Sequence, residues 1–466
     1  MVARFFYFKL MIKNIVICLM LVGNLYAQSD SLYDRDWLPA SFHKMRRDAL
    51  REKMAPKSVA VVFANAVRNR SNDVDFQYSQ DPNFYYLSGL TEPDAVLIIF
   101  KEPQIIDSIT TSELIYVQPR SPKDESWTGK RLGVDGVKKQ LGFTDAYTNE
   151  SFTDLSLDFK KFDKIYHSTF NNDVRDDKTD SGDLYSLIRI FNEKTKDLQT
   201  KDYYAFYALM GDLREIKLPE ELVELRKAID ITCVAHQDLM KKLESNMAEY
   251  QAQAIVEYGF KYNGSEYVGY PSIVGAGENS CILHYITNRK KLTPTDLMVV
   301  DAGAEYHGYT ADVTRTLPVS GKFSPEQKQI YNLVLKAQLA GIDACREGNI
   351  FRSAHNAAVD VIKKGLMDLG IISSPNEFIK YFFHGTSHYL GLDVHDVGNY
   401  GKLKAGQVIT VEPGIYIPEN SPCDKKWWNI GVRIEDDVLI TTGAPDVLSG
   451  KLPKTVEDIE HLMKKK

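Results

Sequence analysis

LMVVDAGAEYHGYTADVTRT, residues 297–316, predicts a β-hairpin that carries two carboxylates on one face. The apolar run Leu297–Asp301 forms the first strand, and His307-Gly308 supplies a two-residue turn. Residue 303 then lies opposite Asp312. Asp301, at the end of the first strand, lies diagonal to Asp312 on the same face. The hairpin therefore brings two acidic side chains close together.

The two carboxylates of this hairpin, Asp301 and Asp312, need a counter-charge. Like charges on one face repel each other, and either a shared proton or a cation must relieve the repulsion. A surface hairpin with hydrated acids is the alternative structure. The apolar neighbours Val299, Val300 and Ala311 make full exposure unfavourable, so the sequence favours a buried hairpin that binds a cation.

Three histidines follow within twelve positions, at His384, His388 and His395. A single histidine usually packs in the core. Three histidines interspersed with Gly385 and Gly391 instead predict a tight loop that directs imidazoles into a cleft. For the other histidines of this half of the chain we expect packing or surface positions; these are His236, His307 and His355.

Two further carboxylates stand at the ends of apolar runs. Glu412 follows Val408–Val411, and Pro413-Gly414 then imposes extended geometry and a turn. Arg433 and Glu435 are two residues apart in a predicted strand, so their side chains share one face. Each position alone says little about function.

Together these segments resemble the metal-site motifs of the pita-bread metallopeptidases, a family that includes aminopeptidase P, prolidase and methionine aminopeptidase. The motifs stand in the family's order at close to its usual spacing, and the resemblance covers most of residues 215–463. They are VDAG (300–303), ADVTRT (311–316), HGTSHYLGLDVHD (384–396), VEPG (411–414) and GVRIEDD (431–437).

Three more segments are similar to the aminopeptidase P branch of that family. The segment at residues 76–100 resembles the N-terminal domain of this branch, a domain that methionine aminopeptidase lacks. The resemblance implies a metal-dependent aminopeptidase that hydrolyses the N-terminal Xaa-Pro bond of peptides. The segments are FQYSQDPNFYYLSGLTEPDAVLIIF (76–100), GENSCILHY (277–285) and GKFSPEQKQIY (321–331).

The resemblance assigns five ligands to two divalent metal ions, with a hydroxide between the ions as nucleophile. Asp312 and Glu435 would bridge the ions. The charge count agrees independently, because four carboxylates balance two dications. One imidazole among four carboxylates suits Mn²⁺ best, although Co²⁺ or Zn²⁺ could bind there. The ligands are Asp301, Asp312, His388, Glu412 and Glu435.

The resemblance also assigns catalytic and substrate-binding side chains. His395 would stabilise the oxyanion, and His284 would handle the substrate and protons. His384 and Tyr270 would line the pocket for the proline, and Arg433 would orient a carboxylate ligand. The catalytic set implied in this way is His284, His384, His395 and Glu412.

Two alternative functions stay open at this point. A prolidase, which is restricted to dipeptides ending in proline, carries nearly the same motifs. A non-catalytic binding protein with this fold would lack one of the ligands, and none of the five is missing. The expected partners are peptides with proline at the second position, and we expect a homo-oligomer, either a dimer or a tetramer.

The fold predicted for the whole chain is α/β (α+β) with two domains. Residues 28–210 form an N-terminal mixed α/β domain of the aminopeptidase P type, and residues 215–466 form the pita-bread catalytic domain. Apolar runs predict buried strands at 58–64 and 95–100, and residues 171–183 predict a loop.

The catalytic domain is expected to open with a helix at Pro219, because proline and two acidic residues suit a first helical turn. We expect another helix from Pro325 to about Cys345, and strands near residues 297–301, 408–412 and 430–440. The apolar stripe predicted for the first helix consists of Leu222, Leu225, Ile229 and Val234.

Residues 1–27 have the features of a signal peptide. Lys13 precedes the apolar run 15–22, and Ala27 offers a small residue for cleavage. That run is shorter than the roughly 20 residues that span a bilayer, so we expect an exported, periplasmic or secreted protein without a stable membrane span. An uncleaved anchor or a buried strand is the alternative.

The net charge of −6 over 466 residues gives no broad cationic surface. Binding of nucleic acid needs such a surface to neutralise phosphates. The sequence therefore predicts no nucleic-acid partner.

Overall fold

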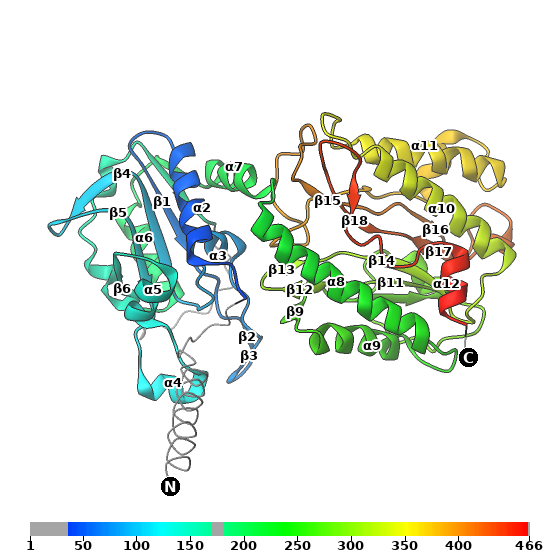
Figure 1. Cartoon of the computed structure of the whole chain (residues 1–466), viewed down its shortest axis with the longest axis horizontal. Coiled ribbons are helices and arrows are strands. Elements are labelled where there is room, and N and C mark those ends of the chain that lie inside the picture. Colours follow the sequence, from blue (N-terminus) through cyan, green and yellow to red (C-terminus); the bar gives the residue numbers. More distant parts are fainter. Residues whose placement is uncertain (1–35, 170–180, 465–466) are drawn as a thin grey trace, which may run out of the picture.

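Two domains lie side by side in the computed structural model, which describes residues 36–169 and 181–464 (Figure 1). The predicted signal peptide, residues 1–27, falls outside the described residues, as does most of the predicted loop 171–183. No helix within the described ranges is long and apolar enough to cross a bilayer.

The N-terminal domain is built on a six-stranded mixed sheet with the order β6-β5-β4-β1-β7-β8. The predicted strand at 58–64 is confirmed, and the predicted strand at 95–100 is longer than expected because it continues into a hairpin. The strands are β1 (Ser58–Phe63), β4 (Val96–Ile106), β5 (Ile109–Val117), β6 (Ala146–Thr148), β7 (Lys164–His167) and β8 (Lys201–Asp202), and β2 (Asn69–Ser71) pairs separately with β3 (Val74–Asp75).

Both faces of this sheet are covered, because alternate residues of β1 enter two different apolar clusters. Helices α2 and α7 contribute to one cluster, and α6 contributes to the other. The helices of this domain are α2 (Ala40–Lys53), α3 (Pro82–Ser88), α4 (Pro122–Thr128), α5 (Gly133–Leu141), α6 (Leu184–Lys194) and α7 (Tyr203–Arg214).

The second domain opens with the predicted helix, α8 (Pro219–Lys242). The Glu221 carboxylate accepts a hydrogen bond from the backbone N–H of Leu218 at 3.0 Å. Proline at the first helical position has no N–H to satisfy, and this bond pairs the N–H of the residue before it. The sequence signal at 218–221 therefore has a direct structural counterpart.

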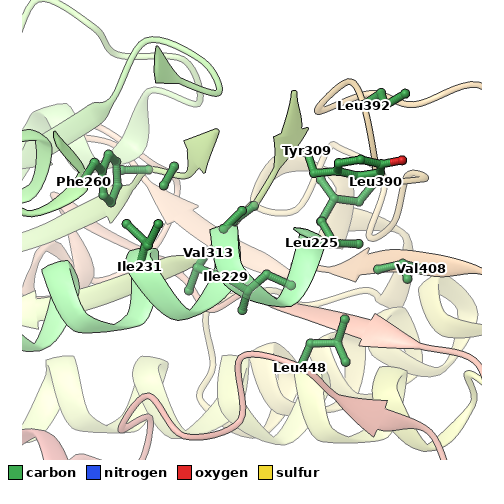
Figure 2. Packing of buried hydrophobic residues seen from close by; sticks show 14 of the residues in the cluster. Leu225, Ile229, Ile231, Phe260, Tyr309, Val313, Leu390, Leu392, Val408 and Leu448 are labelled. Atoms are coloured by element: carbon green, nitrogen blue, oxygen red, sulfur yellow. The ribbon is translucent and has the colours of Figure 1, made fainter. Parts of the chain in front are cut away.

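Helix α8 buries Leu225 and Ile229 as predicted, against the hairpin and the strand that ends before Glu412 (Figure 2). Val234 was wrongly predicted to join this stripe and is 43 % exposed. It lies about 140° around the helix from Ile229, while Cys233 occupies the buried side.

Small antiparallel sheets occupy the interior of the second domain, and α8 packs with α9 as α10 packs with α11 (Figure 1). The predicted helix at 325–345 is confirmed as α10. The helices are α9 (Glu249–Tyr262), α10 (Pro325–Asp343), α11 (Ser353–Asp368) and α12 (Val456–Leu462). The strands are β9 (Tyr267–Val268), β10 (Ile273–Ala276), β11 (Leu297–Asp301), β12 (Ala304–Tyr306), β13 (Tyr309–Thr310), β14 (Thr314–Pro318), β15 (Val408–Val411), β16 (Gly414–Ile417), β17 (Ile430–Arg433), β18 (Asp436–Leu439) and β19 (Asp446–Val447).

The predicted hairpin at 297–316 has the predicted register. Asp301 pairs with Thr314, and the same register runs through the turn at His307-Gly308. Residue 303 therefore lies opposite Asp312, as predicted. The two acidic side chains meet because one uninterrupted register sets their positions.

The single strand predicted at 430–440 is instead two strands, which was an error of the sequence analysis. β17 pairs with β16 and β18 pairs with β15, so the chain passes from one sheet to another at Ile434 and Glu435. The break leaves Glu435 between two sheets, with its backbone N–H donating to the Thr314 carbonyl at 3.1 Å.

Candidate metal centre

The hairpin carboxylates meet at the hydroxyl of Tyr270. This hydroxyl donates to Asp301 Oδ1 at 2.6 Å and also contacts Asp312 Oδ1. Both acids are buried, with 8 % and 5 % of their surfaces exposed. A phenol has one proton and can satisfy only one of the two acceptors at a time. The other carboxylate oxygen needs a proton or a cation of its own.

Arg433 supplies the positive charge for Asp301. Its Nη2 donates to Asp301 Oδ2 at 2.7 Å, and both side chains are buried. Burial alone would raise the pKa of Asp301, but the charge and hydrogen bonds of Arg433 and the Tyr270 hydroxyl lower it overall. Arg433 therefore holds Asp301 ionised and in a fixed orientation.

Asp312 and Glu435 have no such partner. Burial, together with the charge of Asp301, raises the pKa of Asp312 well above its usual range. Burial and the charge of Asp312 do the same to the pKa of Glu435, whose Oε2 accepts from the Thr314 hydroxyl at 2.7 Å. These two carboxyls are crowded together without a neutralising side chain.

Glu412 follows β15 directly, where its backbone N–H donates to the Thr386 carbonyl at 2.9 Å. This bond ties the end of the strand to the histidine loop. Burial and the nearby charge of Glu435 raise the pKa of Glu412 to about 8. A third carboxyl of the site therefore lacks a full counter-charge.

His388 points its Nε2 at these acids, 3.4 Å from Asp312 Oδ2 and 3.7 Å from Glu412 Oε1. Its Nδ1 lies 3.0 Å from the Tyr389 carbonyl, which can only accept, so Nδ1 carries the proton in the neutral ring. The Nε2 lone pair therefore faces carboxylate oxygens. Such an arrangement is repulsive unless a cation or a proton lies between the groups.

The donor set fits divalent cations. Donor atoms of Asp312, His388 and Glu435 all lie within 4.8 Å of one another, a spacing that one metal ion could bridge. Asp301 and Glu412 adjoin this group through the contacts described above. The structure thus brings together all five side chains that the sequence proposed as ligands, and their ligand roles stay a prediction.

A chain of hydrogen bonds links His384 to Asp301. Arg433 Nη1 donates to the Tyr416 hydroxyl at 2.9 Å, and that hydroxyl lies 2.9 Å from His384 Nε2. Arginine can only donate, so Tyr416 accepts from it and donates to Nε2, which leaves the His384 proton on Nδ1 facing the Gly385 carbonyl. Burial and the Arg433 charge lower the pKa of His384 to about 4, which keeps the ring neutral.

His395 and His284 lie at the exposed rim of the site. The His395 ring meets the His388 ring edge to face, with centroids 4.5 Å apart. Partial burial and the neighbouring His388 lower the pKa of His395. A neutral imidazole at the rim can still donate one N–H to a substrate.

The sequence analysis missed Tyr416 and Thr314. It predicted that Tyr270 lines the proline pocket; the structure shows the Tyr270 hydroxyl in contact with two candidate ligands, and the pocket role stays a prediction. No local pattern pointed to Tyr416, because its contacts with His384 and Arg433 join separate segments of the chain. Thr314 could have been found from the hairpin register, because it lies directly opposite Asp301.

Comparison with known proteins connects this geometry to a family. Residues 223–442 match the metallopeptidase family M24, and residues 43–166 match the aminopeptidase P N-terminal domain. A Xaa-Pro aminopeptidase of Haemophilus influenzae is 36 % identical over 439 residues, which cover 91 % of this chain and 98 % of the relative. The Xaa-Pro aminopeptidase of Escherichia coli is 35 % identical over 432 residues, which cover 90 % and 96 %.

Solved structures agree with the sequence comparisons. Aminopeptidase PepP of Pseudomonas aeruginosa superposes with a TM-score of 0.81 at 36 % identity, covering 92 % of this chain and 98 % of that one. Aminopeptidase P of Escherichia coli with the inhibitor Pro-Leu gives a TM-score of 0.81 at 34 % identity, with the same coverage. The chain therefore belongs to the M24 metallopeptidase family, in the branch that carries an aminopeptidase P N-terminal domain.

Proposed function

We propose that this metal-dependent Xaa-Pro aminopeptidase holds two divalent ions at the cluster described above. The supporting observation is the mutual approach of three donor atoms within 4.8 Å, at a site where buried carboxylates outnumber buried cations. The residues that would hold the ions are Asp301, Asp312, His388, Glu412 and Glu435, of which Asp312 and Glu435 would serve both.

The bound ions would supply a nucleophile at neutral pH, because a coordinated water loses its proton far more readily than bulk water. The chain's own residues position the reactants. Arg433 fixes Asp301, and Tyr416 fixes the neutral ring of His384 beside the proline of the substrate. His395 donates to the carbonyl oxygen of the bond that breaks, and His284 contacts the substrate and transfers protons at the rim.

Mn²⁺ is the proposed metal. Four carboxylates and one imidazole form a hard, oxygen-rich set, and no cysteine of the described residues belongs to it. Activity of metal-free protein after addition of Mn²⁺, Co²⁺ or Zn²⁺ tests this choice. Full recovery with Zn²⁺ alone would reject Mn²⁺ as the working ion.

The reaction is tested with matched peptides and Mn²⁺-loaded protein. We expect release of the first residue from Ala-Pro-Phe-Ser and none from Ala-Ala-Phe-Ser, because the site selects proline at the second position. A Xaa-Pro dipeptide serves as the third substrate. Cleavage of the dipeptide alone would mean that the enzyme is a prolidase, which its named relatives do not favour.

We also propose that residues 1–27 direct export and are removed near Ala27. The support is the charged start, the short apolar run and the small residue at the cleavage position. N-terminal sequencing of protein from the native host should begin near Gln28. An intact Met1 or Met11 on cytoplasmic protein would contradict the proposal.

A homo-oligomer, either a dimer or a tetramer, is the proposed assembly. Light scattering coupled to gel filtration measures it directly, against 52.9 kDa for the full 466-residue chain, or the smaller mass left after residues 1–27 are removed. A single species with the mass of one chain would reject it.

A further inference from the structure

The segment that joins the two domains lies against the loop that follows His395. We call this segment, residues 211–218, the connector; it contains the last turn of α7 and ends where α8 begins (Figure 1). The Lys217 backbone N–H donates to the Gly406 carbonyl at 2.8 Å. Three more hydrogen bonds tie the connector to residues 396–406: Asn399 Nδ2 to Asp212 at 2.6 Å, the Asn399 N–H to Glu215 at 3.2 Å and Lys404 Nζ to Glu215 at 2.6 Å.

Asp396 is the buried anchor of this loop. Lys217 Nζ donates to Asp396 Oδ2 at 2.8 Å, and Arg214 Nη2 donates to Asp396 Oδ1. Asp396 and its two partners are each at most 4 % exposed. The packing around them is tight, because a Cβ on Gly391 would clash with Asp396 Oδ2 and with the Lys217 side chain. The carboxylate is therefore held in one position by both charge and packing.

Arg214 also contacts the N-terminal domain. Its Nη1 donates at 2.6 Å to the side-chain oxygen of Asn83, a residue of α3 that is 3 % exposed. The guanidinium group is planar and presents its donors in a rigid fork. One side chain therefore fixes Asp396 relative to the N-terminal domain. A lysine at this position would keep the charge but lose the fork.

His395 precedes Asp396 and lies on the opposite side of the loop. Asp396 is buried, whereas His395 is exposed at the rim of the metal centre. The His395 backbone N–H donates to Asp393 Oδ1 at 3.2 Å, and its ring meets the His388 ring edge to face. The position of the His395 imidazole therefore depends on the backbone that Asp396 anchors.

We propose that Arg214 and Lys217 are positioning residues for His395. By fixing Asp396 they hold the backbone of the preceding residue, and Asn83 extends this constraint into the N-terminal domain. The connector thus makes the N-terminal domain part of the device that sets the geometry of the reaction. The inference rests on the proposed role of His395 in Xaa-Pro hydrolysis and adds the residues that place its imidazole.

Arg214→Lys tests the fork, because it keeps the charge and removes the link between Asn83 and Asp396. We expect kcat for Ala-Pro-Phe-Ser to fall about tenfold to a hundredfold, since a displacement of about 1 Å at a reacting group can cost about a hundredfold. KM should change less than kcat, and metal content should equal that of the wild type.

Lys217→Met is the second variant, and it removes one charge from Asp396 while keeping an unbranched stem of similar length. It should lower kcat in the same way, and it leaves Asp396 paired with Arg214 if Arg214→Lys does not fold. Lys328→Met is the matched control, because its pair with Glu457 is exposed and should leave kcat unchanged. Thermal unfolding checks that each variant is folded.

A double-mutant cycle separates positioning from a purely structural role. In the His395→Ala background the imidazole is absent, so Arg214→Lys should cause no further loss of kcat beyond about twofold. A structural defect would lower kcat by the same factor in both backgrounds. Hydrogen exchange gives a readout independent of activity: amides of residues 391–399 should exchange faster in Arg214→Lys, and those of residues 297–316 should not change.

The outcomes distinguish this inference from the function itself. Equal loss of kcat in both backgrounds, or unchanged kcat in Arg214→Lys and Lys217→Met, would overturn the positioning role. Loss of a metal ion from either variant would also overturn it, because the network would then act on the ligands. Normal turnover by His395→Ala would reject the role of His395 and this inference with it. If metal-loaded wild type cleaves no Xaa-Pro peptide, the proposed function fails instead, and hydrogen exchange still decides whether Arg214 holds the loop.

Discussion

Two neighbouring carboxylates, Glu435 and Asp436, stand in opposite electrostatic surroundings. Glu435 faces the hairpin acids and has no cationic partner beyond the distant charge of Arg433. Asp436 faces the other way, where Arg315 Nη2 donates to it at 2.8 Å and Lys454 also donates. Both acids are almost completely buried.

The pKa values of the two groups differ accordingly. Burial and the Asp312 charge raise the pKa of Glu435, whereas Asp436, although burial would raise its pKa, is lowered by the charges of Arg315 and Lys454. The fold supplies cations to the carboxylate that only supports structure. It leaves Asp312, Glu412 and Glu435 without a side-chain counter-charge of their own, and the divalent ions that the metallopeptidase family implies would supply one.

Asp312→Asn should have the largest effect, because we propose this side chain as a ligand of both ions. We expect loss of at least one ion and a fall in kcat of more than about a thousandfold. The metal-free variant should be as stable as metal-free wild type, since no buried ion pair is broken. Metal analysis, peptide hydrolysis and urea unfolding measure the three quantities, with the exposed Asp230→Asn as control.

Arg315→Met tests Asp436, the carboxylate whose charge is balanced by cations of the chain. Removing one partner of a buried ion pair leaves an uncompensated charge, which costs about 3–5 kcal/mol of unfolding free energy. Metal content per folded chain should not change. Arg226→Met is the control, because its pair with Asp446 is half exposed and contributes at most about 1 kcal/mol. Equal destabilisation by Arg315→Met and Arg226→Met would contradict the claim that Asp436 depends on a buried ion pair.

His395→Ala should keep both ions and the folded state but lose about a hundredfold to a thousandfold in kcat, with a smaller change in KM. The reason is that this imidazole is proposed to act on the developing oxyanion and not on the metal. His461→Ala, at the end of α12, is the control. Loss of an ion from His395→Ala would show that the assigned role is wrong.

The smallest predicted effect is on the pH dependence of stability in acid. Asp396 is buried between Arg214 and Lys217, whose charges lower its pKa although burial opposes them. A folded pKa below the unfolded value means that its stabilisation is present above about pH 4 and is lost as pH falls through the folded pKa. Asp396→Asn should therefore flatten the dependence of stability on pH below 4 by up to roughly 1.4 kcal/mol per unit. An unchanged slope of stability against pH would contradict the claim that Arg214 and Lys217 keep Asp396 ionised in the folded protein.

The sequence predicted the parts of the site whose positions follow from neighbouring residues along the chain. One hairpin register places Asp301 diagonal to Asp312, and a strand end places Glu412, so the residue pattern contained both positions. The break between β17 and β18 was missed, because it arises from pairing with two different strands that lie earlier in the chain.

Other features depend on contacts between distant segments. Tyr416 joins His384 to Arg433 across three separate segments, and no periodicity in the sequence encodes that meeting. The contacts of Asp396 with Arg214 and Lys217 likewise join residues that are 182 and 179 positions apart in the sequence. Such features require the tertiary structure.

The metal content of Mn²⁺-loaded protein, freed of excess metal, tests the central claim most directly. Four carboxylates, of which Arg433 neutralises one in the metal-free chain, should hold two ions per chain. Measurement of two ions per chain in the wild type, with Arg315→Met unchanged per folded chain, is the predicted result. One ion or none under Mn²⁺-replete conditions would contradict the account.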